Sequence, residues 1–119
     1  MKQKLFILLS LLMSTIAFGQ TIWTGGGFNA DWNDTDNWNS SSVPTSSSDV
    51  VIPTGFTVTI STAANVQSIT VQGNSVLNIN ANLTFAEDST FEAGTTINWN
   101  FGTISGNGKT LTNLGTIQI

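Results

Sequence analysis

The stretch TVQGNSVLNINANLTFAEDSTFEAGTTINW, residues 70–99, contains two copies of one pattern. Thr70-Val71 recurs as Thr90-Phe91, and Leu77-Asn78-Ile79 recurs as Ile97-Asn98-Trp99, in both cases at the same distance along the chain. Within each copy, apolar and polar residues alternate, which is typical of short strands that turn every second side chain inward. The stretch therefore predicts a repeating β-structure.

The pattern continues on both sides of this stretch. Val58-Thr59-Ile60 precedes Leu77-Asn78-Ile79 at a spacing one residue shorter, and Ile117-Gln118-Ile119 follows the second copy at the full spacing. A third apolar series, at Val66, Phe85 and Ile104, recurs at the shorter spacing. Three short strands per turn of about 20 residues are typical of a parallel β-solenoid.

We therefore predict an all-β fold, a parallel β-solenoid (β-helix) of about four turns of ~20 residues each. One inward column is predicted at Val51, Val71, Phe91 and Leu111, and another along the series from Ile60 to Ile119. An antiparallel β-sandwich also has short strands with turn signals every 8–12 residues. The solenoid is favoured because the apolar positions come about every seven residues and repeat in threes.

Residues 1–19 have the pattern of a secretory signal peptide. Lys2 and Lys4 precede an apolar run from Leu5 to Met13, and Ala17-Phe18-Gly19 places small residues before Gln20. The apolar run is shorter than the roughly 20 residues that a membrane span requires. We expect cleavage before Gln20, no membrane insertion afterwards, and a secreted or cell-surface protein.

The charge balance of residues 20–119 excludes several classes of partner. Lys109 is the single basic residue after position 19, and with all seven acids the net charge is −6. Such a surface repels nucleic acids and anionic membranes. The chain contains no Cys or His, so a zinc site of these ligands cannot be built.

Residues 20–48 do not fit the repeat and are predicted to form an N-terminal capping segment, with the solenoid turns at 49–119. Trp23, Trp32 and Trp38 lie in this segment among Gly, Asn and Asp residues. These rings either cover the open end of the core, as terminal repeats must, or form a platform that stacks on sugars. We expect Trp23 and Trp38 to be buried and Trp32 to be the exposed, ligand-binding ring.

A run of oxygen-bearing side chains in the same segment suggests calcium, which takes 6–8 oxygen ligands. Its candidate ligands are Asp31, Asn33, Asp34 and Asp36. The run lacks the glycine that an EF-hand has at its sixth position. Asp and Asn are also ordinary turn residues, so both interpretations remain open. No other cofactor is expected.

Glu87, Asp88 and Glu92 are the carboxylates that lie close together in the repeat region. A glycosidase requires two carboxyl groups at a defined separation, one of them with a raised pKa. No acid–base pair can be identified among these three, which are predicted to lie in a solvated turn. We therefore expect that this chain is not an enzyme.

The last repeat ends without a covering segment. Ile117-Gln118-Ile119 has the pattern of an inward strand, and an uncapped solenoid edge invites strand pairing. We expect either self-association at this edge or a solenoid that is incomplete at its C-terminus.

The chain resembles the opening of many secreted bacterial surface proteins, notably those of Bacteroidetes and autotransporter-type adhesins. The residues that carry this resemblance are Trp23-Thr24-Gly25, Trp32, Asn37-Trp38, Val43-Pro44 and Asp49-Val50-Val51-Ile52. In those proteins this opening leads into a right-handed parallel β-helix. The stretch from Val43 to Phe85 also resembles the G8-type module of extracellular proteins.

The residues and this resemblance together suggest one modification site and leave three functions open. Asp88-Ser89-Thr90 resembles the short O-glycosylation motif of Bacteroidetes, in which Ser89 would carry the glycan. The leading expectation is a non-catalytic extracellular structural or adhesion module. The alternatives are a carbohydrate-binding module that binds a polysaccharide or a host or cell-surface glycan, or the front of a β-helix polysaccharide-degrading enzyme whose active site lies beyond residue 119.

Overall fold

The computed structural model describes residues 19–119 of the chain. The predicted signal peptide, residues 1–19, lies outside the described residues except for its last one. In the described part, no helix is long and apolar enough to cross a membrane.

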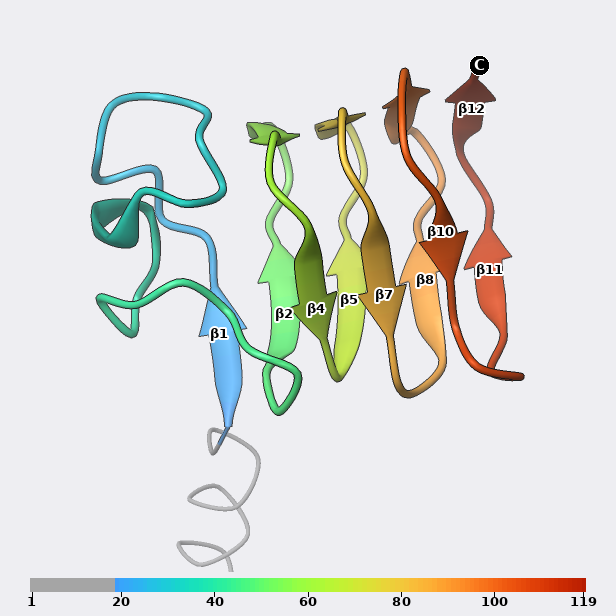
Figure 1. Ribbon diagram of the computed structural model, residues 1–119. Helices are drawn as coiled ribbons and strands as arrows, with labels where there is room; N and C mark the ends of the chain where they lie inside the picture. Colours follow the sequence, from blue (N-terminus) through green and yellow to red (C-terminus); the bar gives the residue numbers. More distant parts are fainter. Residues whose placement is uncertain (1–18) are drawn as a thin grey trace, which may run out of the picture.

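The described residues form short strands separated by turns, with one 3-10 turn, η1 (Thr35–Asn37), near the N-terminus (Figure 1). The strands are β1 (Gln20–Ile22), β2 (Asp49–Ile52), β3 (Thr57–Ile60), β4 (Ala64–Val66), β5 (Ser68–Val71), β6 (Val76–Ile79), β7 (Leu83–Phe85), β8 (Ser89–Phe91), β9 (Thr96–Trp99), β10 (Ile104–Ser105), β11 (Leu111–Asn113) and β12 (Thr116–Gln118).

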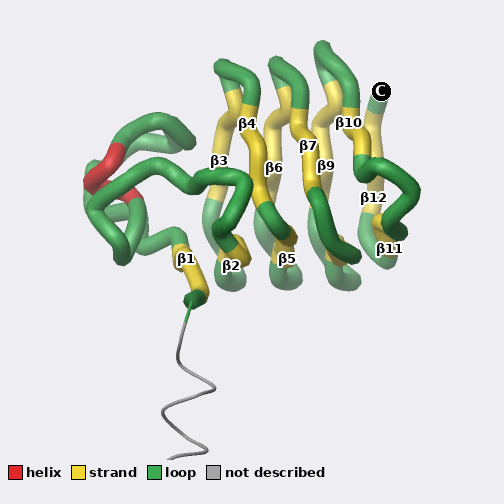
Figure 2. The backbone as a smooth tube through the Cα atoms, turned by 60° about the horizontal axis from the view of Figure 1, so that its bottom comes forward, coloured by secondary structure: helices red, strands yellow, loops and turns green. Residues whose placement is uncertain are grey.

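These strands assemble into three parallel sheets, and successive turns of the chain lie side by side (Figures 1 and 2). The strand orders are β1-β2-β5-β8-β11, β3-β6-β9-β12 and β4-β7-β10. Each turn of the chain contributes one strand to each sheet, which is the arrangement of a β-solenoid of about four turns. The predicted fold class is confirmed.

The hydrogen-bonded register corrects one of the predicted columns. Val71 and Phe91 pair across β5 and β8 as predicted, but Ile52 rather than Val51 stands opposite Val71, because this turn is one residue shorter than the next. Leu111 stands opposite Ser89 rather than Phe91, because the turn between β8 and β11 is longer. Because the turns differ in length, the residues that stand opposite each other shift along the strands, while the strands stay parallel.

A similar shift changes the third series. Val66 and Phe85 pair as predicted, whereas Ile104 pairs with Leu83. In this register Gly106 follows β10 at the level of Phe85, and an added Cβ at Gly106 would overlap the phenyl ring. The ring of Phe85 therefore fills the space that an inward side chain of the next turn would otherwise take.

The remaining series agrees with its prediction except at its end. Ile60, Ile79 and Trp99 are paired in register through β3, β6 and β9. Ile117 pairs with the inward Ile97 and is partly buried. Ile119, predicted to be an inward residue, lies beyond β12 and is exposed, because no strand of the described chain covers it. Self-association at this edge stays a prediction.

Inward and outward side chains have different roles in holding the turns together. The inward residues form one continuous apolar core, in which Ile, Leu and Phe side chains are fully buried and each contributes roughly 1.5–3 kcal/mol. On the outer face, Asn98 donates from Nδ2 to Oδ1 of Asn78 at 2.8 Å, and Asn78 donates to Oγ1 of Thr59 at 3.2 Å. These ladders link one turn to the next and fix their register.

Candidate binding surface at the N-terminal cap

Residues 20–48 lie over the first solenoid turn and cover two of its three sheets. Strand β1 pairs with β2, so it extends the first sheet by one strand. Over β3, the amide of Thr59 donates to the carbonyl of Ala30 at 2.7 Å, and the amide of Trp32 donates to the carbonyl of Thr59 at 3.0 Å. The cap is therefore bonded to the solenoid through main-chain groups on both sheets.

Three tryptophan rings fill the interior of this cap. Trp38 lies between the other two, with its ring centroid 5.1 Å from that of Trp23 and 4.8 Å from that of Trp32, both in edge-to-face geometry. Its indole Nε1 donates to the carbonyl of Trp32 at 2.8 Å. The exposed fractions of Trp23 and Trp38 are 1% and 2%. Both residues are buried, as predicted.

The prediction that Trp32 is the exposed ring is wrong, because the exposed fraction of this residue is 1%. The reason is the main-chain pairing with Thr59, which gives residues 31–33 the alternation of a strand. Asp31 and Asn33 point outward and are both exposed, so the ring between them points inward. The polar neighbours that suggested an exposed ring are the outward half of this alternation.

A buried amide holds the loops of the cap together. Asn37 is fully buried, at 0% exposure. Its Nδ2 donates to Oδ1 of Asn29 at 2.8 Å and to the carbonyl of Asp31 at 3.0 Å, and its Oδ1 accepts from the amide of Gly27 at 2.9 Å. The Asn37 carbonyl also accepts from the amide of Thr24 at 2.7 Å. One residue thus fixes four positions within the stretch from Thr24 to Asp31.

The loop that Asn37 holds presents a phenylalanine to solvent. Phe28 has an exposed fraction of 98% and a left-handed backbone with φ of 59°. Such a backbone is uncommon for a bulky residue. The Phe28 amide donates to the carbonyl of Gly25 at 3.1 Å, which closes the turn. Sequence reasoning missed Phe28, because a single Phe beside three glycines gives no periodic signal.

A shallow groove lies where the cap leaves the third sheet uncovered. It has a volume of about 500 Å³ and is lined by Trp32, residues 43–46 and residues 63–65. Its apolar part is formed by Trp32, Val43, Pro44 and Ala64, and its polar part by Thr45, Ser46 and Asn65. In the described residues, no strand pairs with β4 on this side. The groove is therefore bounded by a free strand edge.

The predicted calcium ligands serve as turn-stabilising groups in the structure. Oδ1 of Asp31 accepts from the amide of Asn33 at 2.9 Å, and Oδ1 of Asp34 accepts from the amide of Asp36 at 3.0 Å, where it caps η1. Among residues 19–119, no group of three or more acidic side chains is placed to hold a metal ion. The geometry gives no support to the calcium prediction, which stays a prediction.

Hydrogen bonds stabilise the ionised form of Asp34. Oδ2 accepts from Nδ2 of Asn29 at 2.6 Å, and this bond, followed by the bond from the Asp36 amide, lowers the pKa of Asp34 below its ordinary value of 3.8. A lowered pKa in the folded state means that Asp34 contributes stability above the unfolded pKa. That contribution is lost as the pH falls through the lower, folded value.

We expect a carbon-detected NMR titration of the Asp34 carboxyl to give a midpoint below 3.8. Replacing Asn29 with alanine removes the larger cause and should move the midpoint upward. An unshifted midpoint in the native protein, or one that does not respond to Asn29→Ala, would contradict this assignment.

The position of Ser89 in the fold gives no support to its predicted glycosylation, which stays a prediction. Ser89 begins β8 and is buried; its hydroxyl accepts from the amide of Ile69 at 3.0 Å and donates to the carbonyl of Glu87 at 3.2 Å. Both bonds lie inside the stacked turns, so the hydroxyl is already hydrogen-bonded within the fold. Its role is to complete the ladder between β5 and β8.

Replacing Ser89 with alanine should lower the free energy of unfolding by about 1–3 kcal/mol, because the buried Ile69 amide loses its acceptor. Urea denaturation followed by circular dichroism measures this change. Thr112→Ala on the exposed outer face of β11 provides a control with an expected change below about 0.5 kcal/mol. Equal effects of the two substitutions would contradict the role given to Ser89.

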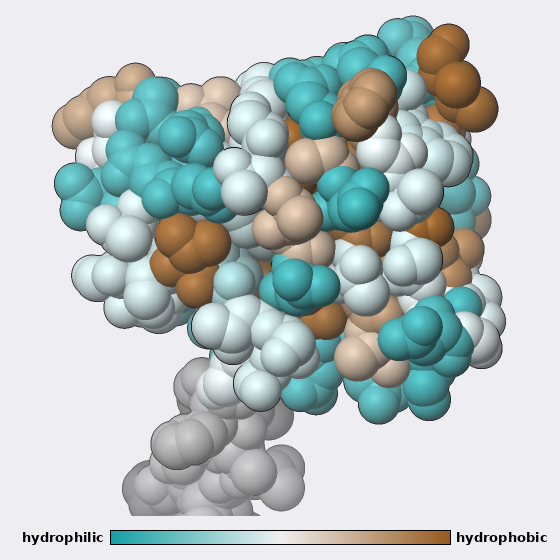
Figure 3. Space-filling model, in the orientation of Figure 1, coloured by the Kyte–Doolittle hydropathy of each residue, from teal (hydrophilic) through white to brown (hydrophobic). Residues whose placement is uncertain are grey.

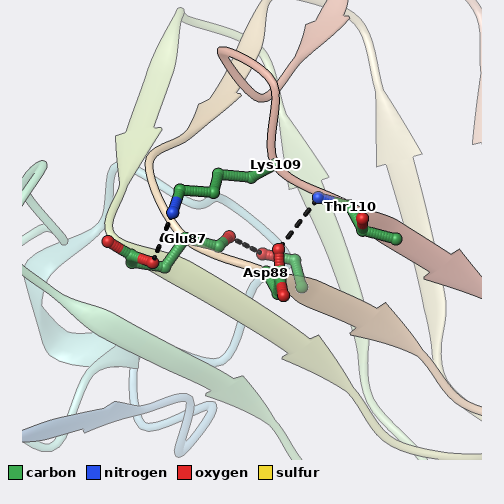
Figure 4. Close-up of polar contacts among 5 residues, drawn as sticks. Glu87, Asp88, Lys109 and Thr110 are labelled. Atoms are coloured by element: carbon green, nitrogen blue, oxygen red, sulfur yellow. Dashed lines mark hydrogen bonds and ion pairs between the residues drawn. The ribbon is translucent and has the colours of Figure 1, made fainter.

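Two of the carboxylates considered for catalysis lie at a turn between β7 and β8 (Figure 4). Oε2 of Glu87 lies 3.3 Å from Nζ of Lys109, and Oδ1 of Asp88 accepts from the amide of Thr110 at 2.9 Å. Both acids thus contact the following turn of the solenoid. An exposed ion pair of this kind contributes little stability, about 0–1 kcal/mol.

Comparison with known proteins identifies one similarity. A family model described as the G8 domain matches residues 37–112, which extend from the end of η1 to β11. Neither the curated proteins nor the solved structures contain a significant match to the chain. The matched stretch includes Trp38 and the solenoid turns. It does not include residues 25–28, the turn that carries Phe28, which is called the Phe28 loop below.

Proposed function

Because the chain belongs to the G8 domain family, we propose that it is a non-catalytic structural or adhesion module of a secreted or cell-surface protein. The G8 domain suggests an extracellular module, and the leader-like residues 1–19 support export. Origin from a bacterial surface protein is part of this proposal and is supported by the resemblance of the Trp-rich opening.

The use of the polar side chains is the observation that carries the proposal. Asp34 caps η1, Asp88 accepts from the next turn, and Glu87 pairs with Lys109. The outer faces carry uncharged hydroxyl and amide ladders, such as Thr59-Asn78-Asn98. These polar groups form hydrogen bonds and ion pairs with other residues of the same chain. This use supports a stiff structural module over a catalytic one.

Carbohydrate binding is a second candidate function, and the groove beside β4 favours it. The buried Trp rings provide no stacking platform, but the groove combines the accessible apolar side chains of Val43 and Ala63 with hydroxyl and amide groups from Thr45, Ser46 and Asn65. Ligand sites combine apolar walls with a few polar groups in this way. On this proposal a sugar binds in the groove, whereas the sequence predicted binding at the ring of Trp32.

Expression of the whole chain in a secreting host tests the proposal. We expect the exported protein to begin at Gln20 by mass spectrometry, and to release no products from a polysaccharide panel. Retention inside the cell would overturn the extracellular assignment. Product release that disappears in a Glu87→Gln, Asp88→Asn, Glu92→Gln variant would overturn the non-catalytic assignment.

A pair of matched variants tests the groove. Ala63→Phe places a large side chain at the groove lining, and Ala86→Phe makes the same change at an exposed position outside the lining residues. If the module binds polysaccharide through the groove, retention on a polysaccharide column should fall for Ala63→Phe alone. Equal retention of both variants would remove the groove as the binding site.

A further inference from the structure

The loop that carries Phe28 exposes an aromatic side chain that takes no part in the packing of the core. Phe28 is 98% exposed and contributes nothing to the core of this chain. Phe101, Leu114 and Ile119 are the other large exposed apolar residues among residues 19–119, and none of them has a left-handed backbone. Figure 3 shows mainly hydrophilic residues over the cap on the face viewed, with small, separate apolar areas.

The loop is held rigidly by close packing against the acidic segment, residues 31–36. An added Cβ at Gly26 would lie 2.7 Å from the carbonyl oxygen of Asp36, and one at Gly27 would overlap the Asp34 carboxylate. Nδ2 of Asn29 donates to both the Gly27 carbonyl, at 3.1 Å, and Oδ2 of Asp34, at 2.6 Å. The glycines are therefore needed for close approach, and the ring of Phe28 projects from a fixed support.

The segment that packs against this loop carries negative charge only. Asp31, Asp34 and Asp36 belong to the segment packed against the loop, and residues 20–48 contain no Lys, Arg or His. Lys109 lies on a turn of the solenoid, where it pairs with Glu87. A partner of this surface must therefore tolerate a strongly negative potential, and a cationic partner is attracted by it.

We propose that Phe28, together with Asp31, Asp34 and Asp36, forms a docking surface for a protein partner that presents Lys or Arg side chains beside apolar ones. Binding energy at an interface concentrates in a few central residues, and large exposed aromatic side chains are often among them. Complementary charge at the rim accelerates association and fixes orientation. A guanidinium or ammonium group can also lie on the face of the phenyl ring.

This surface is distinct from the family's shared structure and from the groove. The G8 match begins at residue 37, so residues 25–36 lie outside it. The groove beside β4 is lined by none of the four residues of the proposed surface, although Trp32 lies between two of them in the sequence. The experiment below can therefore fail while the proposed function stands, and the Ala63→Phe test can fail while this proposal stands.

An NMR titration of the mature chain tests the proposal. The probe is an acetylated Arg-Arg-Leu-Leu-Arg-Arg peptide, and the charge-reversed control is Glu-Glu-Leu-Leu-Glu-Glu. We expect the cationic peptide to shift the amides of residues 24–36, with an affinity that falls as salt is added. The anionic peptide should leave these amides unchanged.

Three variants locate the contact. Phe28→Asn keeps a residue that accepts the left-handed backbone and should weaken binding by about tenfold or more, as for a central interface aromatic. Phe101→Ser removes a phenyl group that is also exposed, on a solenoid turn, and should leave the affinity unchanged. Asp36→Asn, at an exposed carboxylate, should weaken binding about two- to fivefold and reduce its salt dependence.

Four results would overturn the proposal. They are no shift with the cationic peptide, equal shifts with both peptides, unchanged affinity in Phe28→Asn, or the same amide shifts produced by the neutral oligosaccharide cellohexaose instead of the peptide. Circular dichroism of each variant verifies that the comparison is made between folded proteins.

Discussion

Replacing Trp38 with alanine should lower the free energy of unfolding by about 3–5 kcal/mol, the range for large-to-small substitutions of buried aromatic residues. Trp38 is the central ring of the cap and contacts both Trp23 and Trp32. Its removal leaves a cavity between two rings that no other side chain fills. It also removes the donor to the Trp32 carbonyl.

Urea denaturation followed by circular dichroism measures this change, since the method does not depend on the tryptophan removed. Trp38→Phe keeps part of the packing and should have a smaller effect, while Phe101→Ala on the exposed surface should change stability by less than about 0.5 kcal/mol. A loss below about 1 kcal/mol for Trp38→Ala, far under the range for buried aromatic residues, would show that the cap does not support the first solenoid turn.

Replacing Asn37 with aspartate should be about as damaging at neutral pH, with an expected loss of about 3–5 kcal/mol from an uncompensated buried charge. The change is nearly isosteric, so the effect is electrostatic. The new carboxylate oxygen faces the carbonyl of Asp31 and Oδ1 of Asn29, both of which are acceptors. Burial and these acceptors raise the pKa of the introduced carboxyl above its unfolded value.

The pH dependence distinguishes this cause from a general loss of packing. The charged form is the destabilising one, so the loss relative to the native chain is complete above the raised, folded pKa. It shrinks as the pH falls through that value towards the unfolded pKa. Asn37→Leu, which cannot titrate, provides the control and should show a loss that does not depend on pH. A pH-independent loss in Asn37→Asp would contradict the role given to Asn37.

The fold could be predicted because the repeat is evident in the sequence itself. The alternation within Leu77-Asn78-Ile79 and its return at Ile97-Asn98-Trp99 determine both the strand and its partner. What could not be predicted was the length of each turn. One residue fewer between Ile52 and Val71, and two more between Ser89 and Leu111, moved the aligned positions, because turns absorb insertions without disturbing the core.

The candidate site was harder to predict than the fold for a physical reason. The burial of Trp32 depends on a main-chain pairing with Thr59, which is distant in sequence. The exposure of Phe28 depends on glycines whose need for close approach is visible only when Asp34 and Asp36 are in place. Neither relation produces a local pattern, so composition alone favoured the wrong aromatic residue.

The stacking of turns also determines what such a chain can reach. Each turn uses about 20 residues to advance one strand spacing, about 4.8 Å along the solenoid axis. The same residues in an extended linker would span about 65 Å. The solenoid is therefore much shorter than an extended chain of the same length, but it is stiff. Its hydrogen-bonded turns fix the position and orientation of the cap, so a molecule that binds the cap is held at a fixed angle to the solenoid axis.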